Sequence, residues 1–80
     1  MNQQLIFNND FRYNSARQAV QFSCLQAGLR IDCFIRCPAG QTGESWLAQV
    51  KQQAFTWEDH AEQAIAHDKM TANGEVWLAV

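Results

Sequence analysis

Residues 29–37 alternate between apolar and mostly charged positions, and this pattern constrains the fold more than any other feature of the chain. The apolar positions are Leu29, Ile31, Cys33, Ile35 and Cys37. The positions between them are Arg30, Asp32, Phe34 and Arg36. A repeat of two is the side-chain period of a β-strand, whose successive residues point to opposite faces. The pattern therefore predicts a sheet with one buried face and one face in solvent.

A second alternating segment, centred on Phe22, precedes this strand and predicts a β-hairpin. Gly28 lies between the two segments and supplies the positive φ that a hairpin turn requires. A two-residue Ala27–Gly28 loop would place Phe22 opposite Cys33, whereas a four-residue loop ending at Gly28 would place it opposite Ile31. Because alanine is a poor first residue of a type I′ turn, we expect the longer loop. Both registers keep the apolar side chains on one face.

Two shorter strands are predicted near the ends of the chain, over residues 4–7 and 75–80. The second follows an Asn-Gly turn signal and alternates in the same way as the hairpin strands. The polar segment between the first strand and the hairpin is expected to be a loop that is anchored by Phe11 and Tyr13. The sequence thus predicts about four strands.

A helical repeat separates the hairpin from the last strand. Its apolar residues recur at steps of three and four and are Leu47, Val50, Ala54, Trp57, Ala61 and Ile65. One helix over residues 45–69 would be roughly 37 Å long and would outrun an eight-residue strand of about 26 Å. Thr56 also begins a weak capping-box analogue. We therefore expect two helices with a break near Phe55, and one bent helix is the alternative.

The length and composition indicate a single packed domain over residues 1–80. The chain has 80 residues, of which 48% are hydrophobic and 18% are charged. We expect an α+β domain with a small antiparallel sheet, in the order strand, strand, strand, helix, helix, strand, and with the helices packed on one face. The expected core consists of Val20, Phe22, Ile31, Cys33, Ile35, Leu47, Val50, Ala61, Ile65, Val76 and Leu78.

Charge and cysteine content exclude several classes of protein. The net charge of −2 disfavours duplex nucleic acid as a partner. Residues 1–36 carry four arginines against two aspartates, whereas residues 37–80 carry two lysines against six carboxylates, which indicates a basic front and an acidic back. There is no apolar run of about 18 residues and no signal-peptide pattern, so we expect a cytoplasmic protein that does not enter a membrane. Three cysteines, an odd number, fit free thiols.

The sequence contains no pattern that supports catalysis, a cofactor or a metal. Cys33 and Cys37 are about 13 Å apart on a strand, too far for a disulfide or a shared ion. His60 and His67 are two helical turns and about 10 Å apart. Phosphate-binding glycine loops and nucleophile-elbow motifs are missing. We therefore expect a protein that is not an enzyme. Cys24 and Cys33 should face the core, which leaves Cys37 as the candidate reactive thiol.

The polar face of the hairpin is the candidate interaction surface. Its residues are Gln21, Ser23, Arg30, Asp32, Phe34 and Arg36. An exposed aromatic between arginines is typical of protein interfaces and also of single-strand stacking platforms. We expect a protein-interaction or regulatory module whose partner is another protein or a second copy of the chain. Weak binding of single-stranded nucleic acid is the alternative, and a sensor based on Cys37 is a further one. Phe34 would not be available if Phe11 or Tyr13 covered it.

Several short patterns occur in a characteristic order along nearly the whole chain. They are Phe7 before an Asn/Asp-rich loop, Val20-x-Phe22, Gly28, Cys33-x-Ile35, Trp46-Leu47-Ala48, Trp57-Glu58 followed by Ala61, Ala64 and Ile65, and Val76-Trp77-Leu78. In this order they resemble the YrdB-like family of short bacterial proteins, a domain-of-unknown-function family. Similar proteins carry a longer segment between the positions of Arg36 and Trp46. The resemblance implies a small α+β fold with helices on one face of an antiparallel sheet, and it implies no catalytic residues.

Overall fold

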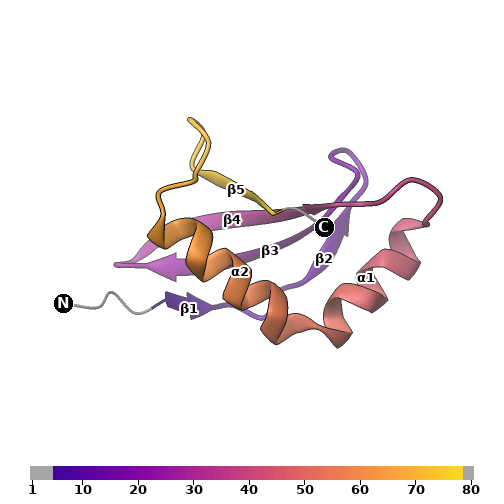
Figure 1. Ribbon diagram of the computed structural model, residues 1–80, viewed down its shortest axis with the longest axis horizontal. Helices are drawn as coiled ribbons and strands as arrows, with labels where there is room; N and C mark the ends of the chain where they lie inside the picture. The colour runs from indigo at the N-terminus through magenta and orange to yellow at the C-terminus, as the bar shows by residue number, and fades with distance from the viewer. Residues whose placement is uncertain (1–4, 79–80) are drawn as a thin grey trace.

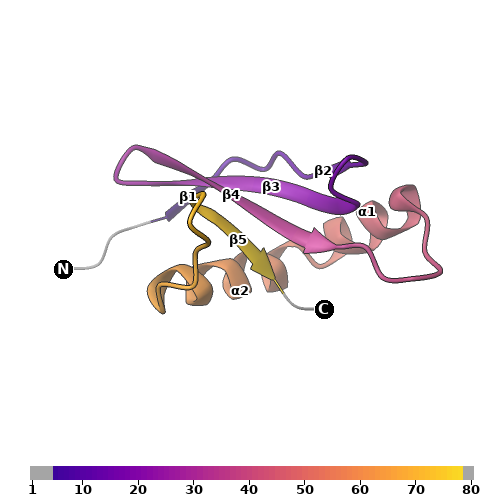
Figure 2. The ribbon, with the colours of Figure 1, turned by 90° about the horizontal axis from the view of Figure 1, so that it is seen from above.

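The computed structural model describes residues 5–78, which form five strands and two helices (Figure 1). In chain order they are β1 (Leu5–Phe7), β2 (Arg12–Asn14), β3 (Ala19–Gln26), β4 (Leu29–Arg36), α1 (Gly43–Gln52), α2 (Ala54–Ala66) and β5 (Glu75–Leu78). Both helices lie on the same side of the sheet (Figure 2). The expected α+β class is therefore confirmed. The expected ends of the first strand at residue 4 and of the last strand at residue 80 lie outside the described residues.

The sheet has β3 and β4 at its centre and is mixed. Strands β1 and β2 follow one another along the same edge of β3, and both pair antiparallel with it. Strand β5 pairs with β4 in parallel. The expectation of about four antiparallel strands is thus wrong in two respects. Residues 12–14 form a strand where a loop was expected, and β5 runs parallel because the helical connection carries the chain back to the end of the sheet where β4 began.

The register of the β3–β4 hairpin places Phe22 opposite Cys33. The loop therefore contains only Ala27 and Gly28, and the expected four-residue loop is wrong. Ala27 has a φ of 52° and Gly28 a φ of 82°, the two left-handed conformations of a type I′ turn. The left-handed region costs an alanine roughly 1–2 kcal/mol. The short loop keeps all eight residue pairs of the two strands in register, and this pairing outweighs the local cost.

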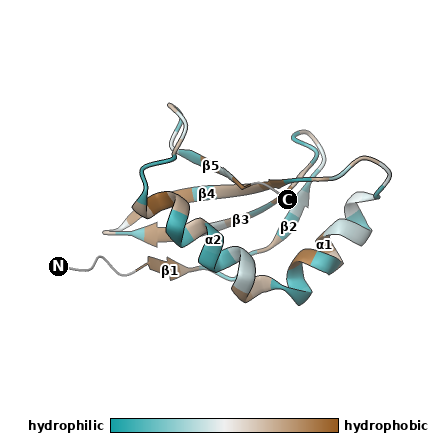
Figure 3. Cartoon of the chain, viewed as in Figure 1, coloured by the Kyte–Doolittle hydropathy of each residue, from teal (hydrophilic) through white to brown (hydrophobic). Residues whose placement is uncertain are grey.

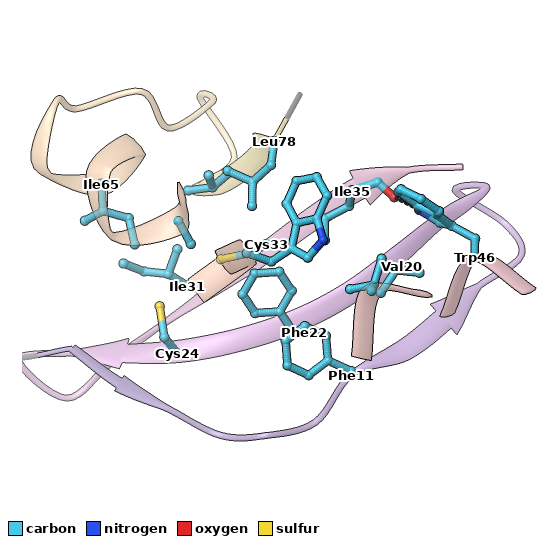
Figure 4. Close-up of a cluster of buried hydrophobic side chains, with 14 residues drawn as sticks. Phe11, Val20, Phe22, Cys24, Ile31, Cys33, Ile35, Trp46, Ile65 and Leu78 are labelled. Atoms are coloured by element: carbon cyan, nitrogen blue, oxygen red, sulfur yellow. Dashed lines mark hydrogen bonds between the residues drawn. The ribbon is translucent and has the colours of Figure 1, made fainter. Parts of the chain in front are cut away.

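The hydrophobic core lies between the sheet and the helices, with Phe22 near its centre (Figure 4). The Phe22 ring stacks on Phe11, with 4.6 Å between the ring centroids. From α1, the Trp46 indole donates its N–H to the carbonyl of Ile35 at 3.3 Å, so its one polar group is satisfied inside the core. The other expected core residues are buried except Leu47, which is half-buried. Hydrophobic colour accordingly follows β1, β3 and β4 in Figure 3.

Two helices are present as expected, but the break falls at Gln53 instead of near Phe55. Gln53 leaves the helical region with a φ of −117° and a ψ of 33°, and it makes no side-chain cap for α2. The predicted cap at Thr56 is wrong, because that residue lies inside α2. The break allows Trp46 and Trp57 to enter the same core, where their rings meet edge to face at 6.2 Å.

Replacing Ala27 with asparagine should stabilise the protein, because asparagine tolerates the left-handed region better than alanine does. We expect Ala27→Asn to raise the free energy of unfolding by about 0.5–1 kcal/mol in urea denaturation. Ala39→Asn is the matched control, since Ala39 is exposed and its φ is not positive. An equal gain in the two variants, or no gain in Ala27→Asn, would contradict the assigned turn.

Candidate functional site

The face of the sheet opposite the helices, here called the outer face, carries all four arginines of the chain. Arg12 and Arg36 are in β2 and β4, Arg30 is near the hairpin turn, and Arg17 reaches over the sheet from the β2–β3 turn. Three carboxylates, Asp10, Asp32 and Glu75, share this face. The helices carry Glu44, Glu58, Asp59 and Glu62 against Lys51 alone. The arginines and the acidic helix surface thus lie on opposite sides of the sheet.

A bulge between β1 and β2 places the carboxylate of Asp10 over β3. Four residues, 8–11, stand opposite only two residues of β3 at this point. Asp10 accepts the backbone N–H of Ser23 at 2.8 Å and its hydroxyl at 2.6 Å. Asn8 donates its side-chain amide to the Ser23 hydroxyl oxygen at 2.9 Å. The Asp10 carboxylate therefore accepts the Ser23 N–H, which a regular neighbouring strand would otherwise bind. This bond matters because Ser23 is completely buried.

The same polar network extends across the outer face to Arg30. Arg30 lies 3.7 Å from the Asp10 carboxylate and donates its Nε–H to Asp32 at 3.0 Å. Gln21 accepts from Asn14 at 3.0 Å and is itself largely buried. Burial opposes ionisation of Asp10, but the hydrogen bonds from Ser23 prevail and lower its pKa below the ordinary value of 3.8. The side chains of Gln21, Ser23 and Asp32 thus all have hydrogen-bond partners within the chain.

Phe34 is not exposed, so the expectation of an open aromatic platform is wrong. Only 3% of its surface is accessible. The ring stacks on Trp77 of β5, with 4.7 Å between centroids, and the Arg17 guanidinium lies 4.9 Å from its centre. Phe11 and Tyr13, the residues expected to cover it otherwise, belong to the helix side of the sheet. The parallel pairing of β5 with β4 brings Trp77 beside Phe34, and the sequence alone did not reveal this pairing.

The two arginines over this aromatic pair differ in how they are bound. Arg17 makes a double hydrogen bond with Glu75 at 3.0 and 2.8 Å, which raises the pKa of Arg17 and lowers that of Glu75. Arg36 lies 5.2 Å from the centre of the Trp77 ring. Within residues 5–78, Arg36 forms no ion pair, although it is exposed. Its guanidinium thus lies over the Trp77 ring and has no carboxylate partner among residues 5–78.

The cysteines occupy the positions that their strand pattern predicts. Cys24 and Cys33 are buried, and hydrogen bonding with Cys24 together with burial raises the pKa of Cys33. Cys37 is half-buried, and its sulfur lies 3.7 Å from the carbonyl oxygen of Pro38 and 3.5 Å from that of Gln41. The Cys37 thiol can donate to these carbonyl oxygens, and Cys37 is the most accessible of the three cysteines.

Among residues 5–78, no three histidine, cysteine or acidic side chains come close enough together to hold a metal ion. Neither α1 nor α2 combines the length and the apolar character that a membrane-spanning helix needs.

The outer face also contains residues outside the predicted surface, namely Asp10, Arg12, Arg17, Glu75 and Trp77. Alternation in residues 75–80 already placed Trp77 opposite the core side of its strand, but the neighbouring strand was unknown. Asp10 likewise gave no signal beyond its place in a polar loop. The structure brings Arg30, Asp32, Phe34 and Arg36 of the predicted surface onto one face, as expected, while it buries Phe34.

Asp10→Asn should destabilise the protein in a pH-dependent manner. Because the folded-state pKa is below 3.8, the stabilisation by the carboxylate is fully present above about pH 5 and is lost as the pH falls through the folded-state pKa. We expect a loss of about 1–2 kcal/mol at pH 7 and a much smaller difference near pH 2 in urea denaturation. Asp59→Asn, on the exposed surface of α2, should change little at either pH. Equal losses for Asp10→Asn at the two pH values would contradict this role.

Alkylation with iodoacetamide should separate the three thiols by their accessibility. At neutral pH we expect Cys37 to react first, because Cys24 and Cys33 are buried, and its rate is compared with that of a cysteine in an unstructured peptide. Cys24 and Cys33 should react only after unfolding. Mass spectrometry of timed samples measures the three rates. Faster reaction of Cys37 than of the free peptide would instead support a thiol-based sensor.

Comparison with known proteins gives matches over almost the whole chain. A family model described as "Protein of unknown function (DUF1488)" matches residues 5–78. The uncharacterized protein YrdB of Escherichia coli (strain K12) is 30% identical over 84 residues, which covers 98% of this chain and 99% of that protein. YrdB of Shigella flexneri is 29% identical with the same coverage. A crystal structure of a DUF1488-family protein of unknown function from Shewanella loihica PV-4 has a TM-score of 0.84 at 26% identity, covering 98% of this chain and 94% of that one. The predicted resemblance to the YrdB-like family is confirmed.

Proposed function

This chain belongs to the DUF1488 family of unknown function, and we propose that it is a non-enzymatic protein-interaction module that binds an acidic segment of a partner protein through its outer face. The observation that carries the proposal is the state of Arg36. Its guanidinium lies over the Trp77 ring but has no carboxylate partner within residues 5–78. A guanidinium held against an aromatic ring still has N–H groups that can form two parallel hydrogen bonds to a carboxylate.

The distribution of charge supports an acidic partner. Arg12 is a second exposed arginine of the outer face that pairs with no carboxylate in the described part of the chain. The acidic helix layer lies on the opposite side and would repel the same partner. Such an asymmetric field raises the rate of encounter on one side and suppresses approach to the other. The partner would thus be oriented before contact.

The outer face offers less to the two other classes of partner. Single-stranded nucleic acid requires open ring faces for base stacking, whereas Phe34 is covered by Trp77 and Arg17. A symmetric dimer through this face would have to pair Arg12 and Arg36 with carboxylates that are already bonded within the chain, since Asp10, Asp32 and Glu75 are held by Ser23, Arg30 and Arg17. Light scattering and oligonucleotide binding distinguish these two alternatives from an acidic protein partner. We recognise no catalytic group among residues 5–78, and we therefore do not propose an enzyme.

Arg36→Glu tests the proposal directly, with Lys51→Glu on α1 as the matched charge reversal. The wild-type protein and both variants are used to capture proteins from an extract of the host, and a captured protein is then purified for titration calorimetry. Loss of a charge-assisted pair should weaken its binding at least tenfold in Arg36→Glu, and Lys51→Glu should bind within a factor of two of wild type. Binding should also weaken as salt rises.

Three outcomes would overturn the proposal. The first is a set of captured proteins that does not differ between wild type and Arg36→Glu. The second is a dimer in light scattering that dissociates in Arg36→Glu, which would identify a second copy as the occupant of the outer face. The third is binding of an oligonucleotide that is lost with the same substitution, which would favour nucleic acid in place of protein.

A further inference from the structure

Strand β5 forms one edge of the sheet, and α2 packs beside it (Figures 1 and 2). Between this edge and α2 runs a groove of about 450 Å³. Its lining includes His60, Ala64 and His67 from α2, Lys69 from the following turn, and Trp77 and Leu78 from β5. The volume lies in the range of sites that accommodate small ligands or a few peptide side chains.

Only some of the backbone N–H and carbonyl groups at this edge form hydrogen bonds within residues 5–78. Glu75 donates its N–H to the Thr71 hydroxyl at 3.3 Å and accepts the Thr71 N–H at 2.8 Å. The Glu75 backbone groups therefore point away from β4. Since residues two apart in a strand direct their backbone groups to the same side, the N–H and carbonyl of Trp77 also point away from β4. No turn or loop of residues 5–78 forms a hydrogen bond with them.

Positive or protonatable groups flank the free edge on both faces of the sheet. On the outer face, Arg36 lies over Trp77 and has no carboxylate partner among residues 5–78. On the helix side, His67 and Lys69 line the groove, and no acidic residue of the described part of the chain lines it. Glu75, the nearest carboxylate of β5, is held by Arg17. An extended segment paired with β5 would direct successive side chains alternately to Arg36 on one face and to Lys69 on the other.

We propose that an extended acidic segment of a partner protein adds to β5 as a further strand of the sheet. The Trp77 N–H and carbonyl would form its main-chain hydrogen bonds. Acidic side chains would lie beside Arg36 on one face and beside His67 and Lys69 in the groove on the other. Strand addition at a free sheet edge is an established way of binding peptides, with main-chain bonds for affinity and side-chain pockets for specificity. The inference rests on the proposed function and adds how the partner binds.

A defined peptide provides the test, namely an eight-residue chain of alternating glutamate and valine with blocked ends. It is added at up to about 2 mM to the full-length ¹⁵N-labelled protein, and amide shifts and hydrogen exchange are followed by NMR. We expect the Trp77 amide to shift and to exchange at least fivefold more slowly. The same peptide N-methylated at its four central residues keeps its charge but cannot donate hydrogen bonds, and it should bind at least tenfold more weakly.

Charge-reversal variants separate edge pairing from general attraction. Lys69→Glu should weaken binding of the peptide about threefold to fivefold, whereas Lys51→Glu on α1 should leave it unchanged. Circular dichroism and thermal unfolding verify that both variants are folded. Equal effects of the two substitutions would contradict the assigned position of the segment.

The outcomes that overturn the inference differ from those that overturn the proposed function. If the peptide shifts signals of the outer face but leaves exchange at Trp77 unchanged, strand addition is wrong and the acidic-partner proposal stands. The absence of any shift at the highest concentration, or equal binding of the N-methylated peptide, also overturns strand addition. Slow exchange at Trp77 without peptide, together with a dimer in light scattering, would make a second copy the occupant of the edge.

Discussion

The eight-pair register between β3 and β4 is the constraint on which the rest of the structure depends. It places Phe22, Cys24, Cys33 and Ile35 on the helix side and leaves polar residues on the other side. A slip by one residue would exchange the two faces and expose the entire core. The strained Ala27 in the turn is therefore tolerated, because the alternative loop would pair fewer residues across the two longest strands.

Most polar and aromatic groups of the outer face already have partners within the chain, and this determines which groups are left for another protein to bind. Asp10 completes the hydrogen bonds of Ser23 at the bulge, and Trp77 covers Phe34. These contacts hold the N-terminal strands and β5 to the central hairpin from its two sides. Arg36 and the backbone of Trp77 are different, since among residues 5–78 no carboxylate pairs with Arg36 and no turn or loop bonds to the Trp77 backbone. A group that is already held against its neighbours requires less ordering on binding.

Local patterns predicted the elements better than they predicted their neighbours. Alternation and helical spacing identified β3, β4, both helices and nearly all the core, because these signals depend on residues a few positions apart. The three-residue β2 carries too short a pattern to be recognised, although its partner residues, 19–21 of β3, follow it closely in the sequence. The position of the helix break was missed by two residues, since Gln53 carries no capping signal. The exposure of Phe34 was mispredicted for a related reason, because its cover comes from a strand more than forty residues away.

By itself, the sequence determined which side chains lie together on each face of each strand and helix, and hence the division into an apolar layer and an arginine-bearing layer. This follows from fixed backbone periods that no tertiary contact alters. Only the tertiary structure decided that β5 lies parallel beside β4, that Trp77 covers Phe34, and that the edge of β5 meets α2 at a groove. Those features arise from contacts between segments far apart in the chain, where packing of the whole core selects the partner and local periodicity does not.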